Sequence, residues 1–267
     1  MEWWEAILLG LVQGLTEFLP VSSSGHLLIT RALLGVDASG FLDFTVTVHF
    51  ATVLSTIIVF WSAIVQIFKG VFQFRYNDET DYFLKLCVSM IPVAVVGFFF
   101  KDQVEALFGE TLSTAGVCLL ITAALLLFAT FYAPKRPNTH RGGISWLQAF
   151  TVGIAQAVAV APGISRSGAT IATGLVTGVK KENMAQFSFL MVLVPILGEQ
   201  ALSLLKAVGG EGFGAGVGVL PLVLGFLAAF ASGLFACKVM IALVRKANLG
   251  WFALYCAAVG ILVLILG

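Results

Sequence analysis

Charged residues are scarce in this chain of 267 residues. Only 11% of the residues are Asp, Glu, Lys or Arg, whereas 59% are hydrophobic, and the mean hydropathy is +1.01. A water-soluble domain of this size cannot hide so much apolar surface, so we expect an integral membrane protein. The formal net charge of +1 and the lack of a Lys/Arg stripe argue against a nucleic-acid partner.

Cysteine, signal-peptide features and polar linkers are also scarce or missing. The four cysteines are scattered through apolar segments without the spacing of metal ligands, which predicts small buried hydrophobes. The N-terminus has acidic residues where a signal peptide carries basic ones. Because no polar linker divides the chain, we expect a single membrane domain over residues 1–267.

Long apolar runs are abundant. A helix of roughly 20 residues crosses a hydrocarbon core of ~30 Å. Six runs reach that length, at residues 44–68, 83–100, 112–133, 185–207, 216–240 and 249–266. Two more apolar regions, residues 5–35 and 144–179, are interrupted by Pro, Gly and serine clusters, and each is predicted to form a re-entrant helix hairpin.

The two interrupted regions are related by a fixed offset of 143 positions. Matching pairs include Trp3/Trp146, Gln13/Gln156, Ser22/Ser165, Ser24/Ser167 and Gly25/Gly168. The offset predicts two repeats, about 1–133 and 144–267, each with one re-entrant hairpin and three transmembrane helices. Since three is odd, the second copy enters from the opposite side. We therefore expect an all-α inverted repeat whose breaks face each other.

Basic residues lie mainly on one side of this predicted topology. When the chain is threaded through the membrane, 11 of the 15 Lys and Arg residues fall on one side and 3 on the other, with Arg166 inside. The positive-inside rule makes the first side cytoplasmic. Both termini and the entrance to the first hairpin are then expected to face outward.

Three ionisable residues, Glu17, His26 and Arg166, lie in or beside the breaks. An ionisable group at membrane depth is costly and marks a candidate functional site. Gln13 and Glu17 share one helix face. New helices are expected to begin at about His26 and Ala169, and their free backbone N–H groups, together with Arg166 and the serines, predict an oxyanion cradle.

A phosphate cradle that contains His and Glu indicates phosphoryl transfer. Ser23 could be the nucleophile with His26 as its base, or His26 could attack phosphorus itself. Glu17 would orient or deprotonate the attacking group, or help to hold a divalent cation. The alternative is a transporter of a lipid phosphate or an anion, because inverted repeats with broken helices are typical of secondary transporters. His49 lies in no motif, and we expect it to make a structural hydrogen bond.

At these residues the chain resembles a known family. Residues 13–26 and 162–170 look like the paired signature of the undecaprenyl-diphosphate phosphatases of the bacitracin-resistance type. The resemblance implies hydrolysis of undecaprenyl diphosphate to undecaprenyl phosphate and inorganic phosphate. It further implies a multi-pass protein of the bacterial cytoplasmic membrane whose site opens to the outer face. The products recycle the carrier lipid for the cell wall, which confers bacitracin resistance.

The same resemblance assigns roles to individual residues. Glu17, Ser23, His26 and Arg166 are the implied catalytic residues. The implied substrate-binding residues are Gln13, Ser22, Ser24, Gly25, Ser165, Ser167, Gly168 and Thr170. A divalent cation, magnesium or alternatively calcium, is implied, with Glu17 as its protein ligand. Many members have Glu where this chain has Gln13, which favours a cation that arrives bridged to the diphosphate. The choice between Ser23 and His26 as nucleophile, and the oligomeric state, stay open.

Overall fold

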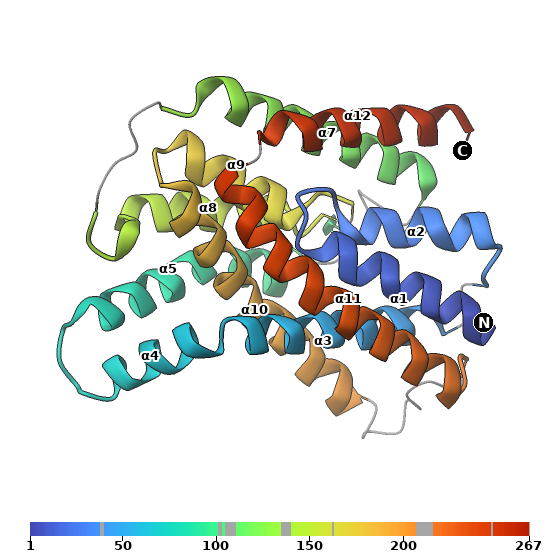
Figure 1. Ribbon diagram of the computed structural model, residues 1–267, viewed down its shortest axis with the longest axis horizontal. Helices are drawn as coiled ribbons and strands as arrows, with labels where there is room; N and C mark the ends of the chain where they lie inside the picture. The colour runs from blue at the N-terminus through green and yellow to red at the C-terminus, as the bar shows by residue number, and fades with distance from the viewer. Residues whose placement is uncertain are drawn as a thin grey trace.

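The computed structural model describes residues 1–37, 40–100, 103–104, 111–134, 140–161, 163–206, 216–246 and 248–266. Within these ranges the chain is helical and contains no strand (Figure 1). The first part holds α1 (Trp3–Glu17), α2 (Ser23–Leu34), α3 (Phe41–Val59), α4 (Trp61–Val71), α5 (Asp78–Phe99) and α7 (Leu112–Tyr132). The second part holds the short helix η1 (Arg141–Gly143), α8 (Trp146–Val158), α9 (Arg166–Val176), α10 (Lys181–Lys206), α11 (Val219–Lys246) and α12 (Leu249–Leu266).

In the part of the chain that the structure describes, five helices are long and apolar enough to cross a membrane, namely α3, α5, α7, α11 and α12. Their surfaces carry large exposed side chains such as Phe98, Phe131 and Ile265, which are more than 70% exposed. Apolar surface of this kind is stable only against lipid or a partner. The prediction of an all-α, multi-pass membrane protein is therefore confirmed at this level.

One of the six predicted spans differs from the structure. The run 44–68 is divided, because Phe60 adopts φ −98° and ψ 13° between α3 and α4. The run 185–207 falls, apart from its last residue, within α10, a helix of 26 residues.

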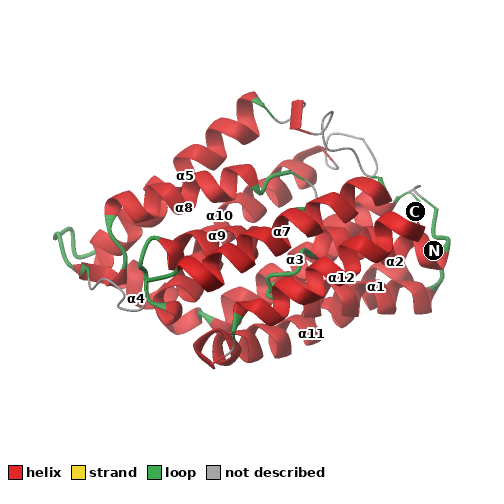
Figure 2. Cartoon of the chain, turned by 90° about the horizontal axis from the view of Figure 1, so that it is seen from above, coloured by secondary structure: helices red, strands yellow, loops and turns green. Residues whose placement is uncertain are grey.

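Helix packing joins the two interrupted regions to the long helices. α1 runs along α11, α7 along α12 and α5 along α8, while α1 and α2 lie side by side (Figures 1 and 2). The α1–α11 contact is close because Gly10 and Gly14 face it: a Cβ on Gly14 would lie 2.5 Å from the carbonyl oxygen of Ala229. Small residues of this kind let membrane helices approach each other.

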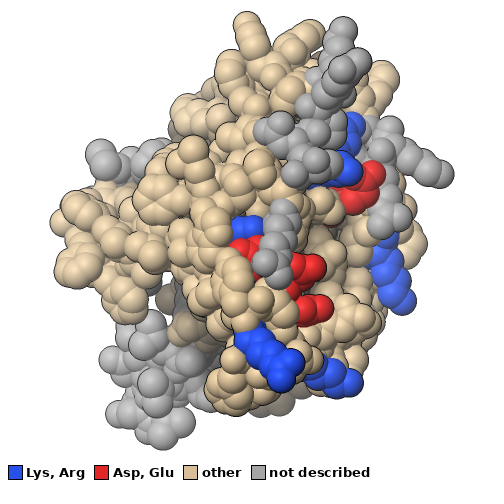
Figure 3. All heavy atoms as spheres, turned by 90° about the vertical axis from the view of Figure 1, so that its left-hand side faces the viewer, with Lys and Arg blue, Asp and Glu red and all other residues tan. Residues whose placement is uncertain are grey.

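Both chain termini lie at one end of the molecule (Figures 1 and 2). The α4–α5 turn lies at the opposite end, where Lys69 closes α4 and Asp78 and Glu79 open α5. Seen from that end, the surface carries Lys, Arg, Asp and Glu side chains among otherwise uncharged ones (Figure 3). Charge is thus gathered at an end of the bundle, as a membrane-embedded body requires.

Each interrupted region folds as two short helices with a buried break between them. α1 and α8 begin at Trp3 and Trp146, and α2 and α9 begin at Ser23 and Arg166, so both pairs keep the 143-residue offset. The second helix of each pair begins three residues earlier than predicted, because Ser22 and Ser165 act as N-caps. Pro162, part of the second motif, lies outside the described residues.

Candidate active site

The two buried breaks contact each other directly. The backbone N–H of Gly163 donates to Ser24 Oγ at 3.3 Å, and Ser167 Oγ donates to the carbonyl of Leu19 at 3.0 Å. The backbone N–H of Ser165 donates to Thr122 Oγ1 on α7 at 3.1 Å. Residues about 140 positions apart in the chain therefore form one polar centre inside the bundle.

Two of the serines cap the N-termini of α2 and α9. Ser22 Oγ accepts the N–H of Gly25 at 3.2 Å, and Ser165 Oγ accepts the N–H of Gly168 at 3.0 Å. Ser22 adopts φ +68°, an unusual conformation for a residue with a side chain. These caps fix the start of each second helix, and with it the direction of the residues that follow Ser22 and Ser165.

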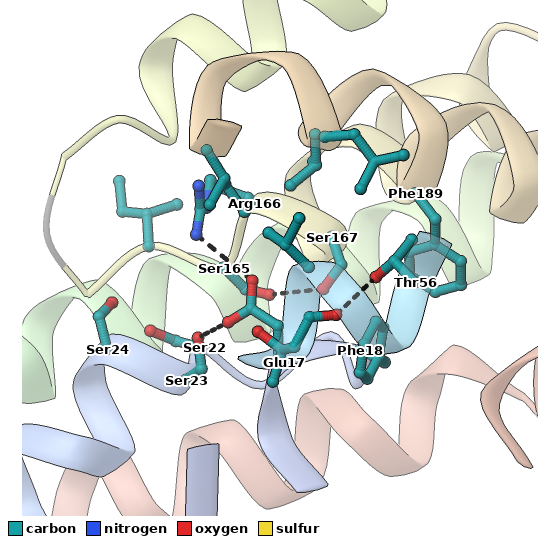
Figure 4. A pocket seen from close by; sticks show the side chains of 16 residues that line it. Glu17, Phe18, Ser22, Ser23, Ser24, Thr56, Ser165, Arg166, Ser167 and Phe189 are labelled. Atoms are coloured by element: carbon teal, nitrogen blue, oxygen red, sulfur yellow. Dashed lines mark hydrogen bonds and ion pairs between the residues drawn. The ribbon is translucent and has the colours of Figure 1, made fainter. Parts of the chain in front are cut away.

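A cavity of about 40 Å³ lies where the breaks meet (Figure 4). Its polar wall consists of Glu17, Ser22, Ser23, Ser24, Ser165, Arg166 and Ser167. The rest of the lining is Phe18, Thr52, Val53, Thr56, Ile164, Phe189, Val192, Leu193 and Ile196. One end of the cavity can therefore hold an anion while the other end is apolar.

The Glu17 carboxylate is the centre of the polar wall. Its Oε2 atom accepts hydrogen bonds from Ser23 Oγ at 2.5 Å and from Gln13 Nε2 at 2.8 Å. Its Oε1 atom lies 3.3 Å from Arg166 Nη2 (Figure 4). The Glu17 side chain is only 10% exposed, so the Arg166 guanidinium balances a carboxylate that water barely reaches. The structure thus brings together three of the four predicted catalytic residues.

The fourth predicted catalytic residue, His26, is buried beside the cavity but does not line it. Its Nδ1 atom lies 2.7 Å from the carbonyl oxygen of Ser22, and its Nε2 atom lies 2.8 Å from the hydroxyl of Tyr255 on α12. A carbonyl only accepts, so Nδ1 carries a proton and, in the neutral ring, Nε2 accepts from Tyr255. His26 therefore stabilises the backbone at Ser22 in this structure. Its direct role in catalysis stays a prediction.

The predicted substrate-binding residues separate into two groups. Ser22, Ser24, Ser165 and Ser167 line the cavity, whereas the other four do not. Gly25 and Gly168 supply the capped N–H groups. Thr170 is fully buried and bonds to Arg166 O and Ser188 Oγ, and Gln13 reaches the cavity only through Glu17.

Sequence reasoning missed the contact between His49 and the site. His49 on α3 places Nε2 3.7 Å from Glu17 Oε2. It also missed Thr52 and Thr56, which lie one and two turns further along α3 and line the cavity. The available signal was the cost of an ionisable residue within an apolar span.

The residues fit a cation that is shared with a phosphate ligand. Among the described residues, no group of three or more His, Cys, Asp or Glu side chains could hold a metal ion. Glu17 offers a carboxylate, and Gln13 Oε1 is buried with no hydrogen-bond partner in the described part of the chain. Magnesium commonly takes one or two protein oxygens and completes its shell with substrate phosphate and water.

Comparison with known proteins gives the family. Residues 6–262 match the family described as bacitracin resistance protein BacA. Relatives from Bacteroides fragilis and Bacteroides thetaiotaomicron are 52% and 53% identical over 265 residues, which cover 99% of this chain and 98% and 99% of theirs. A relative from Carboxydothermus hydrogenoformans is 38% identical over 266 residues, which cover 100% of this chain and 98% of the relative. All three are named undecaprenyl-diphosphatase. With a match over nearly its whole length, this chain belongs to the bacitracin resistance protein BacA family.

Proposed function

We propose that this protein hydrolyses undecaprenyl diphosphate to undecaprenyl phosphate and inorganic phosphate. The names of its relatives support this activity, and one geometric observation carries it. A serine hydroxyl, Ser23 Oγ, donates to the Glu17 carboxylate, and that carboxylate also pairs with Arg166. A nucleophile (Ser23), a base (Glu17) and a guanidinium that can bind phosphate (Arg166) therefore line one small cavity.

The geometry favours Ser23 over His26 as the nucleophile. Glu17 takes the Ser23 proton, Ser23 Oγ forms a bond to the terminal phosphorus, and the bond from phosphorus to the bridging oxygen breaks. Undecaprenyl phosphate leaves with the proton that Glu17 took. Glu17 then takes a proton from a water molecule whose oxygen bonds to the phosphorus of the phosphoserine. The bond from phosphorus to Ser23 Oγ breaks, the proton passes from Glu17 to Oγ, and inorganic phosphate leaves. Arg166 balances the charge on the phosphoryl oxygens, since its planar fork can contact two of them at once.

A divalent cation, magnesium or alternatively calcium, would be held by Glu17 together with the diphosphate. When bound, it would neutralise charge on the phosphate oxygens. Ser24 and Ser167, which line the same wall, would supply hydrogen bonds to the phosphoryl group.

The apolar residues that line the cavity would contact the lipid part of the substrate. Phe189, Val192, Leu193 and Ile196 come from one face of α10 and lie beside the serines. An isoprenoid chain that is joined to the diphosphate would leave the polar centre along this face, where its apolar atoms are removed from water.

The membrane setting completes the proposal. The two helix pairs are re-entrant hairpins of an inverted repeat, so their breaks meet near the bilayer midplane. The protein lies in the cytoplasmic membrane of a bacterium with both termini and the site facing outward, as the distribution of basic residues favours. There it would return carrier lipid to cell-wall synthesis and confer bacitracin resistance.

Phosphate release from undecaprenyl diphosphate by the purified full-length protein in detergent tests the function. We expect release that requires magnesium or calcium, is abolished by a chelator, and is lost in Glu17→Gln. Binding of the lipid without release, with any divalent cation, would favour the transporter alternative. Unchanged release by Glu17→Gln would reject the proposed site.

A further inference from the structure

His49 and Glu17 lie together although 32 residues separate them in the chain. His49 Nε2 is 3.7 Å from Glu17 Oε2, and the two side chains are only 15% and 10% exposed. Glu17 lines the cavity and His49 is not among the lining residues. His49 is therefore placed to act on a substrate through Glu17.

A hydrogen bond to the backbone fixes the orientation of the His49 ring. Its Nδ1 atom lies 2.8 Å from the carbonyl oxygen of Thr45, which can only accept, so Nδ1 carries a proton. This bond directs the opposite ring atom, Nε2, towards Glu17. At 3.7 Å the contact between Nε2 and Oε2 is longer than a hydrogen bond, so His49 acts on Glu17 as a close polar neighbour that occupies the space beside Oε2.

The two oxygens of Glu17 have different partners. Ser23, Gln13 and His49 all contact Oε2, whereas Arg166 contacts Oε1. Arg166 lines the cavity and is 26% exposed, so a phosphate that enters the cavity can compete with Glu17 Oε1 for the guanidinium. In that case Oε1 would lose its partner and the partners of Oε2 would remain.

We infer that His49 is a positioning residue, which holds Glu17 Oε2 against the Ser23 hydroxyl after Arg166 has turned to the substrate. This rests on the proposed function and extends it by a residue that lies outside both motifs. His49 touches neither the lipid nor the reacting phosphorus. It acts by keeping the base in reach of the nucleophile.

Two substitutions separate this role from a merely structural one. In His49→Gln the side-chain amide can still reach the position of Nε2 beside Glu17. In His49→Asn the amide reaches only as far as Nδ1, so the bond to the Thr45 carbonyl can be kept and the contact with Glu17 is lost. We expect His49→Asn to lower kcat for phosphate release by about ten- to a hundredfold with KM within about twofold of wild type. His49→Gln should retain kcat within about threefold.

Thr47→Val on the same helix is the matched control. Thr47 bonds only to the Asp43 carbonyl and does not line the cavity, so this variant should keep wild-type kcat and KM. Wild-type kcat in His49→Asn would overturn the inference. Equal losses of kcat in His49→Gln and His49→Asn would overturn it as well, because a side chain that reaches Glu17 would then not be enough to restore phosphate release. Failure of the wild type to release phosphate would instead reject the proposed function.

Discussion

Replacing Gly14 by Ala should disable the site without touching it. Gly14 lies one turn before Glu17 on α1 and faces α11, where an added Cβ would lie 2.5 Å from Ala229 O and 2.7 Å from Gly233 N. Ordinary contacts are about 3.5 Å, so the two helices must separate by about 1 Å. The nearest atom, Ser232 Oγ, belongs to a side chain and can move, but the two backbone atoms cannot.

The separation has an energetic and a functional cost. Overpacking typically costs about 1–3 kcal/mol, and the helix propensity of Ala returns about 1 kcal/mol, so the net loss of stability is about 0–2 kcal/mol. A shift of about 1 Å at Glu17 disturbs its contacts with Ser23 and Arg166, and such misplacement can lower kcat by about a hundredfold.

The assay pairs phosphate release with thermal unfolding in the same detergent. Gly97→Ala is the control, because no atom lies within 4 Å of the position its Cβ would take, and it should keep full activity and equal or greater stability. Gly14→Ala should lose most of its activity at temperatures where it remains folded. If its activity and midpoint match those of Gly97→Ala, the close approach of α1 and α11 does not set the position of Glu17, and the reasoning is wrong.

Three further substitutions test individual contacts. Ser23→Ala should lower phosphate release by at least about a thousandfold with little change in thermal midpoint, and activity within tenfold of wild type would rule out Ser23 as nucleophile. Arg166→Lys should lower kcat/KM at least about tenfold because a lysine cannot grip two phosphate oxygens in parallel, whereas equal kinetics would show that charge alone suffices. Tyr255→Phe removes the donor to His26 and should cost about 1 kcal/mol in thermal unfolding; the exposed Tyr132→Phe is its control, and equal midpoints would argue against a formed bond.

The breaks in the two short helix pairs could be predicted because their cause is local. Pro20 and the serine clusters interrupt an apolar run, and the 143-residue offset ties the second break to the first. From the expectation that both breaks lie inside the membrane, the proximity of Glu17 and Arg166 followed, and the distance of 3.3 Å agrees with it. The polar centre was therefore predictable in outline.

The partners supplied by spanning helices could not be predicted. A helix that is apolar on all sides, such as α3 or α12, gives no periodic signal for which face points inward. The direction of His49 towards Glu17, and of Tyr255 towards His26, depends on how these helices rotate when they pack. The starting points of α2 and α9 were missed for a different reason, since the capping serines were expected to bind the anion.

The bonds from Gly163 to Ser24 and from Ser167 to Leu19 have a consequence for biosynthesis. The Glu17 carboxylate near the start of the chain gains its cationic partner only once the ribosome has delivered position 166. A product that ends before this position lacks the guanidinium, so by the proposed mechanism it would be inactive. The protein can thus cleave a diphosphate only late in translation, after distant parts of the polypeptide have packed together.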